Sequence, residues 1–171
     1  IPLLGSGSHQ HHAGGGTGLG AATALGLARR GVNLCINYNS SAEAANEVVA
    51  ECQKLGVEAF AVKANVAEDA DCRALVDAAV TNFGGLDVLI NNAGITKFAA
   101  HSDLDALDAE DFLRLYKVNV VAVYQMTRAA KPHLAAAAKA ATSTVAKLPA
   151  MNEPIAASPS AAPARPRRAI W

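Results

Sequence analysis

The chain has 171 residues, of which 51% are apolar, so it is long enough for one domain with a hydrophobic core. Its 15 basic and 15 acidic residues give a formal net charge of zero, which removes the electrostatic reason to expect a nucleic-acid partner. Since no apolar run approaches the ~20 residues of a membrane span and no signal-peptide pattern is seen, we expect a cytoplasmic protein without a membrane partner.

The middle of the chain alternates between helix and strand signals. Helices are predicted over residues 18–30, from a capping box at Ser40 and Glu43 to a stop at Gly56, from the acidic turn at Glu68 to Phe83, and over about 109–130. Strands are predicted over residues 32–38, 57–62 and 86–90. Because strands separated by helices require right-handed crossover connections, the pattern predicts an α/β fold with a doubly wound parallel sheet.

The two ends depart from this alternation. Residues 1–12, "IPLLGSGSHQHH", lack the β-branched run of a buried first strand. Residues 135–171 are rich in Ala, Pro, Ser and Arg and contain no glycine, which indicates a low-complexity, largely disordered tail with at most one Ala-rich helix near residues 135–141. The helix before this tail is expected to break near Pro132. We therefore expect an incomplete sheet over residues 13–134, with unpaired edges and low stability.

A glycine-rich turn precedes the first predicted helix. Gly14, Gly18 and Gly20 have the spacing G-x-x-x-G-x-G in "AGGGTGLG". Free backbone N–H groups and the positive end of the helix dipole at such a turn suit a diphosphate. A chance loop is the competing interpretation, and the strands and helices that follow favour the phosphate site.

A second motif, "NNAG", comes directly after the strand predicted over residues 86–90. Together with "AGGGTGLG" it resembles the short-chain dehydrogenase/reductase family, and the resemblance covers roughly residues 13–134. The segments "INYNSSAEAANEVV" and "KANVAED" are similar to their counterparts in the family's 3-oxoacyl-carrier-protein reductases and its sugar or alcohol dehydrogenases. The resemblance implies a Rossmann-like NAD(P)-binding domain that acts on a small carbonyl or alcohol substrate.

The resemblance also assigns site residues. By it, the pyrophosphate would lie against Gly14, Thr17, Gly18, Leu19 and Gly20, and the adenine against Asn65 and Val66. Asn91, Ala93 and Gly94 would flank the ribose and the carboxyl edge of the sheet, whereas Asn92 is expected to brace the strand. Asn119 matches the asparagine that holds a water near the family's catalytic lysine.

The end of the second predicted strand bears on the choice of cofactor. NAD-preferring enzymes place a carboxylate there, whereas this chain has Tyr38, Asn39 and Ser40. Nothing at these positions repels a 2′-phosphate, and the neutral side chains are able to donate to one. We therefore predict NADP, with NAD as the second choice.

No metal site is expected. The three cysteines form no C-x-x-C pair and are interpreted as reduced thiols; they are Cys35, Cys52 and Cys72. His9, His11 and His12 have no acid or cysteine beside them, so a tag-like or shifted segment is favoured over a metal site.

The family's catalytic Tyr-x-x-x-Lys is missing. None of the three tyrosines is followed four residues later by lysine; Tyr124 precedes Arg128, and arginine is too basic and too planar to replace the lysine. By lineage we expect an NAD(P)-dependent oxidoreductase, inactive in this chain.

Three other points stay open. The chain is alternatively a truncated or frame-shifted fragment that at most binds a nucleotide weakly or serves as an interaction module. A third, less favoured function is weak binding of nucleic acid or anionic lipid by the basic segment 165–168. Family tetramers pack through helices that this chain partly lacks, which leaves its homo-oligomeric state undecided.

Overall fold

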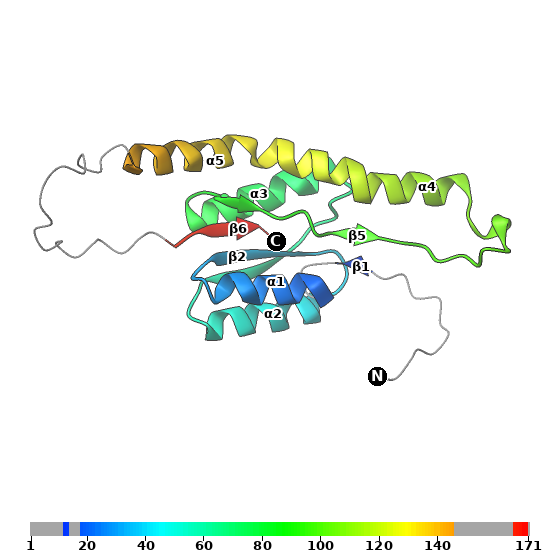
Figure 1. The fold of residues 1–171 in the computed structure, drawn as a ribbon, viewed down its shortest axis with the longest axis horizontal. Helices are drawn as coiled ribbons and strands as arrows, with labels where there is room; N and C mark the ends of the chain where they lie inside the picture. Colours follow the sequence, from blue (N-terminus) through cyan, green and yellow to red (C-terminus); the bar gives the residue numbers. More distant parts are fainter. Residues whose placement is uncertain (1–11, 14–17, 146–165, 171) are drawn as a thin grey trace, which may run out of the picture.

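The computed structural model describes residues 12–13, 18–145 and 166–170 (Figure 1). Its helices are α1 (Gly18–Ala28), α2 (Ala42–Lys54), α3 (Asp69–Phe83), the short 3₁₀ helix η1 (Leu104–Ala106), α4 (Ala109–Tyr116), the π-helical turn η2 (Lys117–Val121) and α5 (Ala122–Val145). Its strands are β1 (His12–Ala13), β2 (Asn33–Tyr38), β3 (Ala59–Lys63), β4 (Val88–Leu89), β5 (Gly94–Ile95) and β6 (Arg168–Ile170).

The main sheet is parallel and has four strands in the order β3-β2-β6-β4. Helices α1 and α2 cover one face, and α3 and α5 cover the other, as Figure 1 shows. A separate antiparallel pair joins β1 to β5, with Ala13 opposite Gly94. The predicted α/β doubly wound architecture is therefore confirmed.

The middle of strand β2 is apolar on both of its faces. Leu34 and Ile36 pack into the cluster beneath α1 and α2, whereas Cys35 packs into the cluster beneath α3 and α5. Successive side chains of a strand point to opposite faces, and both faces of this sheet are covered. Alternation between apolar and polar residues is therefore absent from the middle of β2.

The helix ends agree with the sequence only in part. Gly84 ends α3 in the left-handed conformation with φ 73°, as its place after Phe83 predicts. The capping box predicted at Ser40 and Glu43 is wrong. The N-cap residue of α2 is Ser41, whose side chain makes no capping hydrogen bond. Glu43 is therefore the second residue of the helix, whereas a capping box needs the acidic side chain at the third. A capping box does form at α4, between Asp108 and Asp111.

The break predicted near Pro132 is also wrong. Helix α5 continues through Pro132 to Val145, so residues 135–145 are helical and the helix crosses the predicted boundary at 134/135. Pro132 lies on the exposed side of the helix, while Ala130 before it and Leu134 after it pack against the core. Proline removes one backbone hydrogen bond, and contacts on the opposite side of the helix are able to compensate for that loss.

The largest correction concerns residues 168–170, predicted to belong to a disordered tail. They form β6, which pairs in parallel with β2 on one side and with β4 on the other. The sheet therefore has no missing strand between β2 and β4. The rest of the expected atypical segment and tail, residues 1–11, 146–165 and 171, lies outside the described residues.

Among the residues described, no helix has the length and apolar character needed to cross a membrane. The same part of the chain contains no cluster of three or more His, Cys, Asp or Glu side chains arranged to hold a metal ion.

The three cysteines are free and buried, as predicted for reduced thiols. Burial raises the pKa of Cys35 to about 12 and of Cys72 to about 11, and it also raises the pKa of Cys52. Because only the thiolate reacts, we expect essentially no labelling of the native chain by a disulfide reagent at pH 8, and labelling of all three thiols after denaturation. Fast labelling of one thiol in the native chain would contradict this.

Candidate functional site

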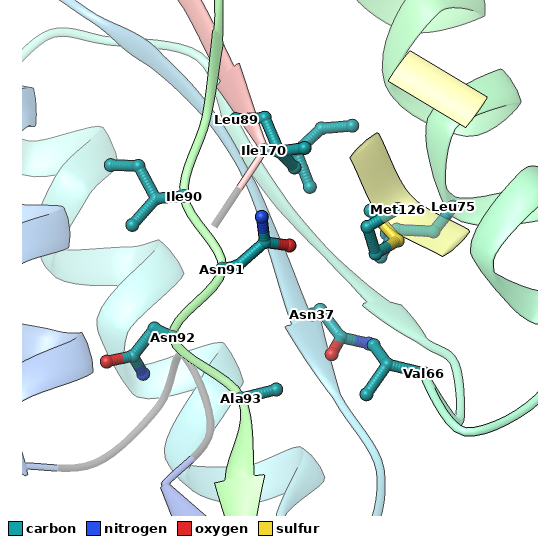
Figure 2. Close-up of a pocket in the computed structure, with 10 residues that line it drawn as sticks. All are labelled: Asn37, Val66, Leu75, Leu89, Ile90, Asn91, Asn92, Ala93, Met126 and Ile170. Carbon is teal, nitrogen blue, oxygen red and sulfur yellow. The ribbon is translucent and has the colours of Figure 1, made fainter. Parts of the chain in front are cut away.

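The carboxyl ends of the parallel strands meet at one edge of the sheet and form a pocket. The empty space at this pocket is about 330 Å³, a volume that includes open solvent. Ligands of open α/β sheets bind at this edge. The residues around it, drawn in Figure 2, are Asn37, Val66, Leu75, Leu89, Ile90, Asn91, Asn92, Ala93, Met126 and Ile170.

Asn37 is the most buried polar side chain of the pocket, at 8% exposed. Its amide Nδ2 donates to the carbonyl oxygen of Ala64 at 2.9 Å and approaches the carbonyl of Val62 at 3.4 Å. These bonds tie the end of β2 to the chain leaving β3. Sequence reasoning missed Asn37; the signal was an amide directly after the apolar run of residues 34–36, one residue before the end of the strand.

The segment after β4 alternates its side chains about the pocket. Figure 2 shows Asn91 pointing toward the side of Ile170 and Asn37, and Asn92 pointing the opposite way. Ala93 again faces the first side, where a small side chain leaves room next to Val66. The structure thus brings Asn91 and Ala93 together at the sheet edge, with the side chain of Asn92 pointing the opposite way.

Asn65 and Val66 follow β3. Val66 borders the pocket, whereas the Asn65 side chain accepts a hydrogen bond from the N–H of Ala67 at 3.1 Å. The N–H of Asn65 donates to Asp71 Oδ2 at 2.8 Å. The side-chain oxygen of Asn65 therefore shapes the turn into α3.

The described part of the glycine turn lies at the start of α1. Gly18 has φ +53°, a conformation that favours glycine; apart from its chain neighbours and its own helix backbone, no atom of the described residues lies within 4 Å of the position a Cβ would take. Leu19 is 77% exposed and Gly20 is buried. Gly14 and Thr17 lie outside the described residues, but Ala13 pairs with Gly94, so the turn begins beside the "NNAG" segment.

Asn119 fastens the helical segment to β5. Its Oδ1 accepts from the N–H of Ile95 and its Nδ2 donates to the carbonyl of the same residue, both at 2.9 Å. A Cβ on Gly94 would lie 3.4 Å from Asn119 Oδ1, an ordinary van der Waals distance. Asn119 lies in the π-helical turn η2, a feature common at functional sites.

The residues predicted to set cofactor choice surround the end of β2. Tyr38 is its last residue and is half-buried, while Asn39 and Ser40 are exposed. Lys63, which sequence reasoning did not select, is the register neighbour of Tyr38 on β3. This corner of the sheet thus carries neutral donors and a cation.

Tyr124 and Arg128 lie on the outer side of α5. Tyr124 is 64% exposed, and Arg128 lies over its ring while pairing with Asp69. The hydrogen bond from Arg73, together with that from Arg128, holds the pKa of Asp69 below its usual value. None of the described residues that line the pocket is ionisable, so this pair supplies no acid or base there.

Comparison with known proteins identifies the lineage. A model of the short chain dehydrogenase family matches residues 12–151. The chain belongs to the short-chain dehydrogenase/reductase family.

Individual members of the short-chain dehydrogenase/reductase family agree. An uncharacterised oxidoreductase of Methylorubrum extorquens is 42% identical over 121 residues, which are 71% of this chain and 48% of that protein. A Burkholderia cenocepacia short chain dehydrogenase in complex with NADP has a TM-score of 0.67 and 43% identity, over 71% of this chain and 48% of its own. An NADH-dependent reductase complexed with NAD has a TM-score of 0.65 and 36% identity, over 74% of this chain and 51% of its own. The chain spans about half the length of the curated relatives it matches.

Proposed function

We propose that this short-chain dehydrogenase/reductase chain binds a nicotinamide dinucleotide, NADP in preference to NAD, and has no carbonyl–alcohol turnover of its own. The observation that supports the proposal is the pairing of Ala13, the residue before the glycine turn, with Gly94, which directly follows the Asn91–Ala93 wall of the pocket. Both features lie where open α/β sheets bind nucleotides.

The residues present fit such a ligand. The positive φ of Gly18 and its lack of a side chain suit the close approach of a diphosphate to the start of α1, which Gly14, Thr17, Leu19 and Gly20 would flank. Val66 and Asn65 would border the adenine, and Asn91, Ala93 and Gly94 the ribose. When bound, the nicotinamide would donate or accept a hydride.

The preference for NADP rests on the end of β2. Tyr38, Asn39 and Ser40 offer no carboxylate to repel a 2′-phosphate, and Lys63 adds a positive charge on the neighbouring strand. NADP is present in the solved B. cenocepacia relative and NAD in the NADH-dependent reductase. Both cofactors therefore belong in the test.

The absence of turnover rests on chemistry. Carbonyl reduction needs a group that delivers a proton, worth roughly 10²–10⁴-fold in rate. No tyrosine of the chain has a lysine four residues later, and the described lining of the pocket is not ionisable. Asn119 would keep a positioning role through Ile95 without a proton to move.

The test titrates the full chain with NADPH and NADH, followed by the fluorescence of the reduced nicotinamide. We expect saturable binding of NADPH, tighter than of NADH. Asn39→Asp is expected to weaken NADPH binding roughly tenfold and to leave NADH binding unchanged, because a carboxylate repels the 2′-phosphate. Asn46→Asp makes the same charge change on the exposed side of α2 and serves as the control.

Two outcomes would contradict the proposal. Failure of both dinucleotides to bind would overturn the cofactor site and favour an interaction module. Consumption of NADPH with a panel of ketones, abolished by Asn119→Leu, would overturn the absence of turnover.

Compartment and assembly remain predictions. Three free, buried thiols are what a reducing cytoplasm permits. Phe112, Tyr116 and Val120 are exposed on α4 and η2, so a homo-oligomer would have an apolar surface to bury. No nucleic-acid partner is proposed, since Arg168 of the basic segment is paired with Asp87.

A further inference from the structure

Strand β6 occupies an unusual place in the chain order. In doubly wound sheets of order 3-2-1-4, the strand between the second and fourth is the first one, which leads into the glycine turn. Here that place, between β2 and β4, is taken by Arg168–Ile170 near the other end of the sequence (Figure 1). The glycine turn is instead preceded by β1, which pairs with β5 outside the main sheet.

Backbone hydrogen bonds hold β6 on both sides. The N–H of Asn33 in β2 donates to the carbonyl of Arg167 at 2.7 Å. On the side of β4, the N–H of Asp87 donates to the carbonyl of Arg168 at 2.9 Å, and that of Ile90 to the carbonyl of Ile170 at 3.1 Å. Ala169 and Ile170 are 0% and 1% exposed, so the strand belongs to the core.

A two-pronged ion pair aligns the start of the strand. Arg168 Nε lies 2.7 Å from Asp87 Oδ2 and Nη2 lies 3.0 Å from Oδ1, while the N–H of Arg168 donates to Oδ2 at 2.9 Å. Gly85 makes room for the guanidinium, because a Cβ there would lie 2.6 Å from Arg168 Nη1. Arg168 lowers the pKa of Asp87, as expected for a carboxylate accepting these bonds.

Register matters for the pocket. In the observed register Ile170 packs beneath α3 and α5 and lines the pocket near Leu89, whereas Ala169 packs beneath α1 and α2. A slip of one residue would exchange these faces. In one direction of slip, the methyl group of Ala169 would take the place in the pocket wall where Ile170 now has a branched side chain.

We propose that β6 replaces the first strand of the sheet and completes the wall of the nucleotide pocket, and that Asp87 and Arg168 are the positioning pair that sets its register. The nucleotide as the ligand of this pocket rests on the proposed function. The placement of β6 and the role of Asp87 and Arg168 rest on the strand pairing alone.

The experiment compares the full chain with Asp87→Asn and Arg168→Gln by amide hydrogen exchange and NADPH titration. The amide of Asn33 donates to Arg167, directly before β6, and those of Asp87 and Ile90 donate to β6 itself. Exchange at these three amides is expected to accelerate roughly tenfold in both variants. The amide of Leu34 donates to the carbonyl of Glu58, the residue directly before β3 on the other side of β2, and should keep its protection. The dissociation constant for NADPH should rise in parallel. Arg167→Gln removes an adjacent but exposed arginine and should change neither measurement.

The outcomes separate the two proposals. Exchange unchanged in both variants, or equal to that of Arg167→Gln, would overturn the positioning role. Loss of protection at Leu34 together with the other amides in both variants would also overturn it, because the pair would then stabilise the whole domain. If the unaltered chain bound neither dinucleotide, the proposed function would fail. The exchange pattern would still show whether Asp87 and Arg168 set the register of β6.

Discussion

Leu34→Ala is expected to lower the free energy of unfolding by about 4 kcal/mol, near the upper end of the range for such substitutions. Leu34 is completely buried in β2. Its register neighbours on the two adjacent strands, Ala59 and Ala169, are small and pack into the same cluster, so neither is able to fill the cavity. Denaturant unfolding followed by circular dichroism measures the loss, and the melting temperature should fall by roughly 10 °C.

The matched control is Leu104→Ala in η1. Leu104 is 88% exposed, so the same deletion of side-chain atoms is expected to change the stability by less than about 0.5 kcal/mol. Equal effects of the two substitutions would show that β2 is not covered by α1 and α2, and the packing described above would be refuted.

Asn37→Leu is expected to destabilise the chain by about 1–3 kcal/mol, even though leucine is more apolar and similar in size. The substitution removes the donor to Ala64 and leaves a carbonyl without its partner at the base of the pocket. Because the turn after β3 carries Val66 into the pocket wall, NADPH binding should weaken as well. Thermal unfolding and the nicotinamide fluorescence titration measure the two effects.

Asn46→Leu on α2 is the control for this substitution. Asn46 is exposed, so its replacement is expected to stay within about 0.5 kcal/mol of the unaltered chain. A stabilising effect of Asn37→Leu would mean that burial of the leucine outweighs the lost hydrogen bonds, and Asn37 would then have no structural role in the site.

Most of the candidate site could be predicted from local sequence. A glycine turn that opens a helix and an amide pair that follows a buried strand are continuous motifs, and parallel strands bring their carboxyl ends to one edge. Asn91, Ala93 and Val66 accordingly line the pocket, and Gly94 lies beside Asn119. Asn37 was missed because its role depends on a carbonyl 27 positions away in the chain.

The sequence alone determined the alternation of helices and strands from Gly18 to Tyr116, because apolar periodicity, glycine stops and acidic first turns act within a few residues. Only the tertiary structure decided the course of the chain around Pro132 and the place of β6. A proline inside a helix is tolerated when contacts on its opposite side hold both halves. Three residues have no intrinsic preference strong enough to predict a strand, so Arg168–Ile170 became one only through the hydrogen bonds and burial that β2, β4 and Asp87 provide.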